Sequence, residues 1–261
     1  NIIVTIDYRK DFKKNKGINV LIALESIAVL PQTFNNKYLQ NFDLIFTWNT
    51  DIIDNLKIFP LNFTFNLDPL EYINFKNKTR LLCNVSSNKL SNHKDELYSE
   101  RVKAIEFFNS TYPDKFDLFG YGWDKAYKYP FFYQFFRFLN QNKVFRGVSK
   151  VLTNIRLFDN LIYTNYSVYK GPVASKVQVL KNYKFSICFE NIKNVDGFIT
   201  EKIFDCFVCG VIPIYLGPKN IDQTIPKSTF IDMRDFSSYS KLFDYLSEMK
   251  ESEYKVYIEN I

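Results

Sequence analysis

Apolar residues along the chain form short runs that alternate with polar or helix-periodic stretches. Each run predicts a β-strand, because a few consecutive apolar residues bounded by turn residues are typical of a strand buried on both faces. The runs lie at 2–8, 18–26, 43–49, 80–87, 117–122, 183–191, 211–217 and 229–236. Strands that alternate with helices in this way predict an α/β architecture with parallel sheets and right-handed crossovers.

Helical periodicity separates several of these strands. Helices are predicted at 93–108, 199–209 and 237–249. In the second of them, Ile199, Ile203 and Phe207 recur every four residues and define one apolar face. Gly210 follows directly and predicts the end of this helix, because glycine is common just after the last helical residue.

Residues 123–165 have a different character, since they are aromatic and basic and show no clean strand pattern. One interpretation is a helical insertion packed on the core. A second is an acceptor-side or membrane-surface patch, where basic residues meet acidic lipid head groups and aromatic rings lie in the interface. A third is binding of single-stranded nucleic acid, which also uses bases and aromatic rings together.

Composition narrows these alternatives. The 261 residues are 46% hydrophobic and 24% charged, which is typical of a globular chain of one or two domains. The net charge of +6 is local, because residues 121–156 carry seven basic residues and one acidic residue. The rest of the chain is close to neutral, so we expect no nucleic-acid partner.

The cysteines do not indicate a metal site. Cys206 and Cys209 have CxxC spacing, but the residues between them belong to the apolar face of a predicted helix. With no second CxxC and a single histidine, His93, zinc is not indicated. We expect these two cysteines, together with Cys83 and Cys188, to be reduced thiols in the core.

Membrane spans are not predicted, because no run reaches the roughly 18 apolar residues that a spanning helix needs. The chain begins at Asn1 rather than at a methionine. An upstream targeting segment or anchor would therefore lie outside this sequence.

The stretch GFITEKIF (197–204) raises a chemical question. Thr200, Glu201 and Lys202 fall in the first turn of a predicted helix, where an acid is favoured and a lysine is not. Ligands of open parallel sheets bind at the carboxyl ends of strands, beside such helix starts. Lys202 is thus predicted to help bind an anion such as a nucleotide diphosphate, with Glu201 accepting hydrogen bonds from sugar hydroxyls. The alternative is a surface Glu–Lys pair.

A longer string surrounds this stretch. YKFSICFEN (183–191), GFITEKIFDCFVCGVIPIYLG (197–217) and IPKSTFIDMRDF (225–236) closely resemble the α-1,3-fucosyltransferase family. The shared signature is a Phe-Glu-Asn strand end, a short loop, a Tyr-x-Thr-Glu-Lys helix start and a G-x-x-P-x-x-x-G segment. The resemblance extends from about Val168 to Met249.

Two weaker similarities to the family lie upstream. Residues 85–108 resemble a Val-x-Ser-Asn segment followed by an arginine that opens a helix, which maps Ser87, Asn88 and Arg101. Residues 23–52 resemble a Glu-Ser-Pro segment followed by a strand, which maps Glu25, although Ile27 stands in place of the proline.

The resemblance implies two Rossmann-like domains of the GT-B glycosyltransferase type, with the active site in the cleft between them. Residues 1–80 would form the acceptor-side domain, and residues 81–261 the nucleotide-sugar domain with the insertion at about 123–165. It also implies GDP-fucose as the donor, a hydroxyl of an oligosaccharide or glycoconjugate as the acceptor, an α-1,3 linkage and inversion at the anomeric carbon. The location would be cytoplasmic or membrane-peripheral in a bacterium or virus, and the Golgi lumen in a eukaryote.

Roles follow residue by residue from the resemblance. Lys202 and Arg101 would bind the pyrophosphate, Glu201 and Asn191 would bind ribose or fucose hydroxyls, and Glu25 would be the general base. The donor-binding set is Arg101, Lys202, Glu201, Asn191, Phe198, Ser87 and Asn88. No essential metal or other cofactor is expected, because cationic side chains can stabilise the leaving pyrophosphate and no Asp-x-Asp triplet occurs.

The residues leave alternatives open. Glu25 lies in an apolar run, where a charge is costly unless it is paired or functional, but it also fits a strand end that emerges into solvent. Glu190 fits a structural hydrogen-bonding role, and Arg101 fits a plain helix surface. Phe198 stands where the family has tyrosine. Two rival functions therefore remain: the same fold with another nucleotide sugar, and a non-catalytic glycan- or nucleotide-binding remnant.

Overall fold

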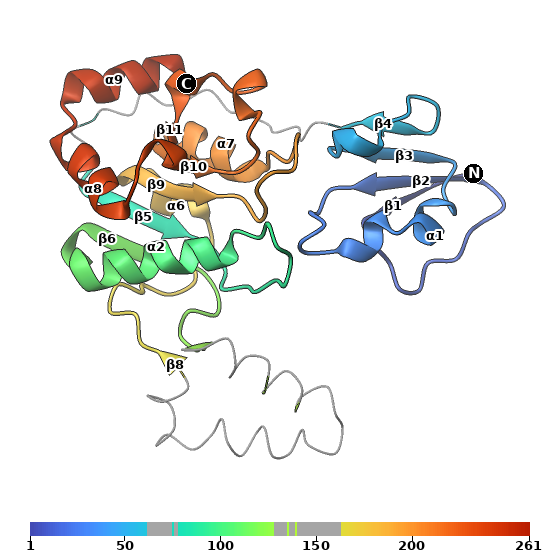
Figure 1. The fold of residues 1–261 in the computed structure, drawn as a ribbon, viewed down its shortest axis with the longest axis horizontal. Helices are drawn as coiled ribbons and strands as arrows, with labels where there is room; N and C mark the ends of the chain where they lie inside the picture. Colours follow the sequence, from blue (N-terminus) through green and yellow to red (C-terminus); the bar gives the residue numbers. More distant parts are fainter. Residues whose placement is uncertain (62–74, 76–77, 128–134, 136–138, 140–162) are drawn as a thin grey trace.

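The computed structural model describes residues 1–61, 75, 78–127, 135, 139 and 163–261. Within them, two parallel sheets form two lobes that lie side by side in Figure 1. The first sheet consists of β1 (Ile2–Ile6), β2 (Ile18–Ala23), β3 (Leu44–Thr47) and β4 (Ile58–Pro60), paired in chain order. Helix α1 (Asn36–Leu39) packs on this sheet, where Leu39 and Phe42 meet Leu21 and Ile45 in one apolar cluster.

The second sheet has the strand order β11-β10-β9-β5-β6, with every neighbouring pair parallel. Its strands are β5 (Arg80–Val85), β6 (Phe116–Phe119), β9 (Tyr183–Phe189), β10 (Ile212–Leu216) and β11 (Ile231–Asp232). The helices around it are α2 (Tyr98–Thr111), α6 (Lys176–Leu180), α7 (Glu201–Val208), α8 (Tyr239–Glu248) and α9 (Glu251–Asn260). A two-stranded antiparallel pair, β7 (Ala126–Tyr127) and β8 (Tyr163–Thr164), lies below this lobe in Figure 1.

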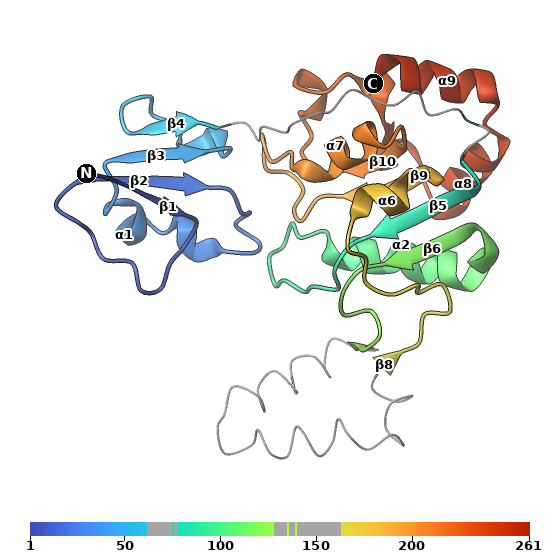
Figure 2. The same cartoon turned by 180° about the vertical axis from the view of Figure 1, so that it is seen from behind.

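Helices cover both faces of the second sheet, because successive side chains of a strand point to opposite sides. Ile187 and Ile214 belong to the apolar cluster shared with α2, α8 and α9. Their neighbours Cys188 and Tyr215 belong to the cluster shared with α6 and α7. The views from the two sides show α2 and α8 on one face and α6 and α7 on the other (Figures 1 and 2). Both faces are therefore buried, as the continuous apolar runs predict.

The order of strands in the second sheet defines a switch point. Numbered within the sheet, β5 is the first strand, and the chain adds β6 on one side of it and then β9 on the other. Connections therefore leave β5 and β9 in opposite directions, which opens a crevice at their carboxyl ends. This is the position at which open α/β sheets bind ligands.

Several predicted elements differ in extent from the observed ones. The strand predicted over 229–236 shrinks to Ile231–Asp232, because the Asp232 side chain accepts a hydrogen bond from the Arg234 backbone N–H at 3.0 Å and starts a 3₁₀ turn. The helix predicted from residue 93 begins at Tyr98. The residues before it form a turn, in which the Leu97 N–H donates to the Asn191 carbonyl at 3.1 Å.

Other predictions hold or stay open. The α/β architecture with parallel sheets is confirmed, and Gly210 ends α7 with a φ of 56°. Strand β4 and helix α9 were not predicted. The aromatic and basic stretch 123–165 lies largely outside the described residues, as does most of the connection at 62–77 between the sheets. The boundary at residue 80 stays a prediction.

Candidate active site

A cavity of about 400 Å³ lies between the two lobes, at the carboxyl ends of β2, β5 and β9. The first lobe contributes Asp7, Leu24 and Glu25 to its wall. The second lobe contributes Val85, Ser86, Ser87, Lys89, Tyr98, Arg101, Lys176, Asn191, Phe198, Thr200, Glu201 and Lys202. The cavity therefore occupies the switch-point crevice of the second sheet, and the first lobe forms part of its wall.

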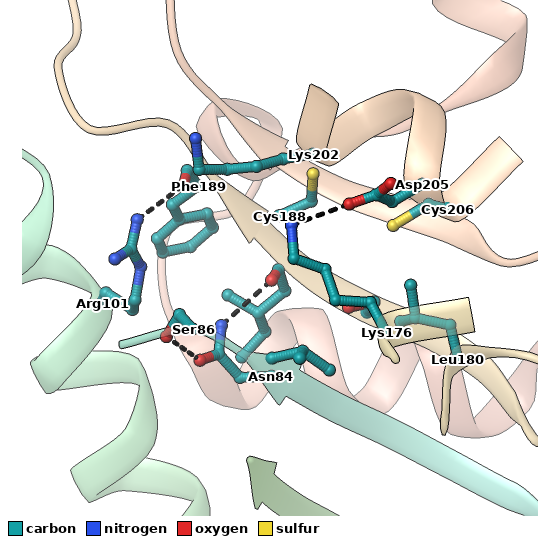
Figure 3. A pocket seen from close by; sticks show the side chains of 13 residues that line it. Asn84, Ser86, Arg101, Lys176, Leu180, Cys188, Phe189, Lys202, Asp205 and Cys206 are labelled. Carbon is teal, nitrogen blue, oxygen red and sulfur yellow. Dashed lines mark hydrogen bonds and ion pairs between the residues drawn. The ribbon is translucent and has the colours of Figure 1, made fainter. Parts of the chain in front are cut away.

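A smaller cavity of about 30 Å³ shares Arg101, Lys176 and Lys202 with the larger one. These three cationic side chains come from α2, α6 and α7 and surround it in Figure 3. Asn84 and Ser86 line the same space from the end of β5. Three helices from separate parts of the chain thus place positive charge at the carboxyl ends of β5 and β9.

The buried carboxylate of Glu190 explains the unusual start of α7. Its side chain has no exposed surface, and it accepts hydrogen bonds from the Thr200 backbone N–H at 2.8 Å and the Thr200 hydroxyl at 2.7 Å. Lys202 Nζ lies 3.0 Å from the same carboxylate, and the Tyr215 hydroxyl donates to it at 3.3 Å. Lys202 therefore compensates a buried acid at the helix start, and its ion-pair partner is Glu190 rather than the adjacent Glu201.

Glu201 pairs with Lys176 instead, at 3.4 Å, and Lys176 also lies 2.8 Å from Asp205. Burial pushes the pKa of Lys176 down, but the carboxylates of Asp205 and Glu201 outweigh it and raise that pKa overall. Burial pushes the pKa of Glu201 up, and the nearby ammonium groups of Lys202 and Lys176 lower it overall. Lys176 was not predicted, because no spacing in the sequence links it to a helix start 25 residues further on.

Arg101 is buried and is not a helix-surface residue, since only 4% of it is exposed. Its Nη2 donates to the carbonyl oxygens of Phe189 at 2.8 Å and Glu190 at 3.3 Å. The guanidinium carbon also lies 5.3 Å from the centre of the Tyr98 ring. Burial lowers the pKa of Arg101. The contacts orient the guanidinium at the end of β9, beside both cavities.

Glu25 follows β2 and reaches the cavity from the first lobe. The backbone N–H groups of Leu24 and Glu25 donate to Asp7 Oδ1 at 2.7 and 3.0 Å. Asp7 itself has a φ of 54°, an uncommon conformation for a non-glycine residue. Asp7 therefore holds the loop that carries Glu25, a role that the sequence did not indicate.

The remaining predicted residues separate into two groups. Ser87 and Asn191 line the cavity beside Glu201. Phe198 also lines it but is 1% exposed and packs edge-on against Trp48 of the first lobe, at 4.6 Å between ring centres. Asn88 does not line it, and its Nδ2 donates to the Gly122 carbonyl at 3.0 Å. The structure thus brings together all predicted site residues except Asn88.

Other features of the described residues bear on the site. Cys83, Cys188, Cys206 and Cys209 are free and buried, as predicted. In the part of the chain that the structure describes, no cluster of three His, Cys, Asp or Glu side chains is placed to bind a metal ion. No helix of that part has the length and apolar character needed to cross a membrane.

Comparison with known proteins finds similarity to fucosyltransferases. Residues 138–259 match the family model of glycosyltransferase family 10 (fucosyltransferase), C-terminal region. The α-(1,3)-fucosyltransferase FucT of Helicobacter pylori is 35% identical over 74 residues, which are 28% of this chain and 15% of that protein. The mouse 4-galactosyl-N-acetylglucosaminide 3-α-L-fucosyltransferase 9 is 37% identical over 84 residues, which are 31% of this chain and 23% of that protein. The matched segments thus span less than a quarter of these relatives.

Solved structures agree on the fold. A crystal structure of an α1,3-fucosyltransferase superposes with a TM-score of 0.51 and 15% identity, over 93% of this chain and 63% of that chain. The crystal structure of TarM superposes with a TM-score of 0.53 and 8% identity, over 96% of this chain and 48% of that chain. These likenesses confirm the predicted GT-B fold. The match over residues 138–259 makes this part of the chain similar to the C-terminal region of glycosyltransferase family 10, the fucosyltransferase family.

Proposed function

We propose that this chain is an inverting glycosyltransferase that moves L-fucose from GDP-fucose to a hydroxyl of an oligosaccharide or glycoconjugate, forming an α-1,3 linkage without an essential metal. The observation that carries this proposal is the cavity between the lobes, which Arg101, Lys176 and Lys202 line from one lobe and Glu25 from the other. The match of residues 138–259 to the fucosyltransferase family model and the similarity to named fucosyltransferases support the choice of sugar.

The cations have hydrogen-bonding capacity left for a pyrophosphate. An ammonium group has three N–H donors, and Lys202 uses two of them on Glu190 and Thr200. Lys176 uses two on Glu201 and Asp205. The carboxylates orient the ammonium groups before any ligand arrives, and such preorganised charge stabilises a leaving group at little further cost.

Transfer would then proceed as one displacement. The acceptor hydroxyl oxygen bonds to the anomeric carbon of fucose while the bond from that carbon to the phosphate oxygen breaks. The electron pair leaves with GDP, next to Lys202, Lys176 and Arg101. Glu25 accepts the proton of the attacking hydroxyl from the opposite side, because a general base must lie within hydrogen-bond reach of the proton it removes.

Two other functions remain as outcomes of a test. A different nucleotide sugar is one of them, because Phe198 stands in place of a tyrosine and is buried against Trp48. A glycan- or nucleotide-binding protein without transferase activity is the other. The first alternative predicts that a different nucleotide sugar binds. The second predicts that a ligand binds but that no sugar is released from it.

Calorimetric titration with GDP-fucose, GDP-mannose, GDP, UDP-galactose and UDP distinguishes them. We expect GDP and GDP-fucose to bind and the UDP ligands not to bind. Lys176→Ala should raise the Kd for GDP about tenfold or more, since a hydrogen bond to a charged group contributes about 1.5–3 kcal/mol. Lys219→Ala, which changes an exposed lysine outside the cavity, is the matched control.

The outcomes have distinct meanings. Tighter binding of UDP ligands would overturn the choice of donor, and binding of GDP-fucose without release of fucose to water or acceptor would favour the non-catalytic alternative. Transfer that continues at the same rate in EDTA would support a metal-independent reaction, and its loss would contradict one.

A further inference from the structure

A second cavity of about 600 Å³ adjoins the candidate active site and shares Lys89 and Tyr98 with it. Its walls come from the exposed side of α2, from Ala28 and Val29 of the first lobe, and from residues 88–90, 122, 123, 125, 126 and 166. The volume lies within the range of about 300–1,000 Å³ that is typical of small-molecule sites. Nothing in the proposed donor chemistry uses this space.

Tyr98 stands in the wall between the two cavities with an unused hydroxyl. Its side chain is 3% exposed, and its Oη has no hydrogen-bond partner among the described residues. Leaving a buried polar group unpaired costs about 1–3 kcal/mol. Burial, together with the nearby carboxylates of Glu25 and Glu96, raises the pKa of Tyr98 to about 12, although Arg101 acts in the opposite direction. The hydroxyl therefore remains a hydrogen-bond donor at ordinary pH.

The walls of the second cavity are held by hydrogen bonds. The Asn88 amide donates to the Gly122 carbonyl at 3.0 Å, and the Trp123 indole donates to the Ser86 carbonyl at 2.6 Å. The Ser91 hydroxyl donates to the Ala28 carbonyl at 2.7 Å, which joins the two lobes at the rim. The cavity is therefore built into the fold rather than being a gap between loose loops.

The lining combines apolar surface with neutral and charged polar groups. Leu90, Val102 and Trp123 give it apolar faces, while Asn88, Ser99 and Glu106 offer hydrogen-bonding groups. Sugars present both an apolar ring face and several hydroxyls, so this mixture suits a carbohydrate better than a lipid chain. Residues of the first lobe that follow Glu25 closely in sequence complete the cavity, which brings its contents close to the proposed base.

We propose that the second cavity binds the part of an oligosaccharide acceptor that lies beyond the reacting sugar, and that the Tyr98 hydroxyl donates a hydrogen bond to the acceptor where the two cavities meet. This inference rests on the proposed transferase function. It predicts that longer acceptors are better substrates and assigns Asn88, which lies outside the donor cavity, to the acceptor side.

The test compares acceptor lengths. The probes are the disaccharide 4-galactosyl-N-acetylglucosamine and a hexasaccharide of three such repeats, a class named for the mouse relative. In the wild-type chain we expect kcat/KM to be about tenfold higher for the hexasaccharide, which corresponds to about 1.4 kcal/mol of added binding. Ser99→Trp, which puts an indole into the second cavity, should remove this advantage.

Two further variants sharpen the test. Ser110→Trp makes the same change at an exposed position near the other end of α2 and should keep the advantage of the longer acceptor. Tyr98→Phe should raise the acceptor KM about tenfold through loss of one hydrogen bond. It should not lower the midpoint of unfolding, because that hydroxyl has no partner in the folded protein. If the tyrosine were purely structural, the variant would lower the midpoint of unfolding and leave the acceptor KM unchanged.

Each result supports or overturns the inference. Equal kcat/KM for both acceptors in the wild-type chain, or equal effects of Ser99→Trp and Ser110→Trp, would overturn it while GDP-fucose still binds. No transfer to either probe with normal GDP-fucose binding would overturn it as well. Absence of GDP-fucose binding in the wild-type chain would instead overturn the proposed function, and this inference with it.

Discussion

Lys202 Nζ lies 3.0 Å from Oε2 of Glu190. The Glu190 carboxylate, which follows β9, has no exposed surface and lies beside the start of α7. An unpaired charge in such a place is very costly, and the partially positive helix start and the lysine both compensate it. The lysine therefore has a structural role that is present before any ligand binds. Its remaining hydrogen-bonding capacity is what the proposed donor site uses.

The Glu190–Lys202 pair should dominate the stability of this region. Lys202→Met is expected to lower the free energy of unfolding by about 3 kcal/mol, because it leaves the buried carboxylate without its counter-charge. The double variant Glu190→Gln with Lys202→Met should lose at least about 1 kcal/mol less than the sum of the two single changes. Urea denaturation of the four proteins measures this coupling. As a control, Lys219→Met, at an exposed position, should change stability by less than about 0.5 kcal/mol. If the losses in the two single variants simply add up in the double variant, Glu190 and Lys202 do not stabilise each other.

Glu25→Gln tests the proposed base. We expect kcat for transfer to fall by about 10²–10⁴, since removal of a general base commonly has effects of this size. The Kd for GDP should change little, because the cations that face the pyrophosphate come from the other lobe. Rapid-quench or steady-state kinetics with calorimetry would separate the two effects. Asp51→Asn, at an exposed position in the first lobe, serves as control, and an unaltered kcat in Glu25→Gln would rule out this base.

Gly197 controls how closely the lobes approach. It has a φ of 82°, and a β-carbon at this position would lie 2.5 Å from the Trp48 carbonyl oxygen of the first lobe. Gly197→Ala should therefore cost more than the roughly 1–3 kcal/mol of backbone strain alone. It should also lower kcat/KM, because it moves Glu25 relative to the cations.

Gly171 offers the matched comparison. It also has a positive φ, 99°, but a β-carbon there would meet nothing within 4 Å. Gly171→Ala should thus show the strain without the clash and leave transfer kinetics unchanged. Thermal unfolding and transfer kinetics of both variants give the comparison. Equal losses of stability and of kcat/KM in the two variants would show that the close approach of residue 197 to Trp48 affects neither.

The salt-bridged Glu201 predicts a pH dependence. Lys202 and Lys176 outweigh the effect of burial and hold the pKa of Glu201 below its usual 4.5 in the folded protein. A lowered pKa means that the stabilising contribution is complete above the unfolded value and is lost as the pH falls through the folded one. Glu201→Gln should therefore be less stable than wild type at neutral pH, and the difference should shrink below pH 4.5. Urea denaturation at several pH values measures this stability difference, with Glu248→Gln, at an exposed position, as control. A stability difference that grows on acidification would contradict the lowered pKa of Glu201.

The sequence alone determined the fold class and the position of the candidate site along the chain. Continuous apolar runs and four-residue periodicity are local properties, so they predicted strands at 183–191 and 211–217 and a helix that ends before Gly210. The structure has these strands at Tyr183–Phe189 and Ile212–Leu216. The Thr-Glu-Lys helix start lies within the same local pattern, and its resemblance to a family mapped Glu25, Arg101 and Lys202 to one site.

Only the tertiary structure decided how these residues are used. Glu190 meets Lys202 because β9 ends beside the start of α7, and Lys176 meets Glu201 because α6 and α7 lie on one face of the sheet. Asp7 supports the Glu25 loop across a pair of parallel strands. Such contacts join residues that are distant in the chain, and they depend on strand order and register. No periodicity in the sequence records that order, because parallel strands that end at a common edge are brought together only by the packing of the whole sheet.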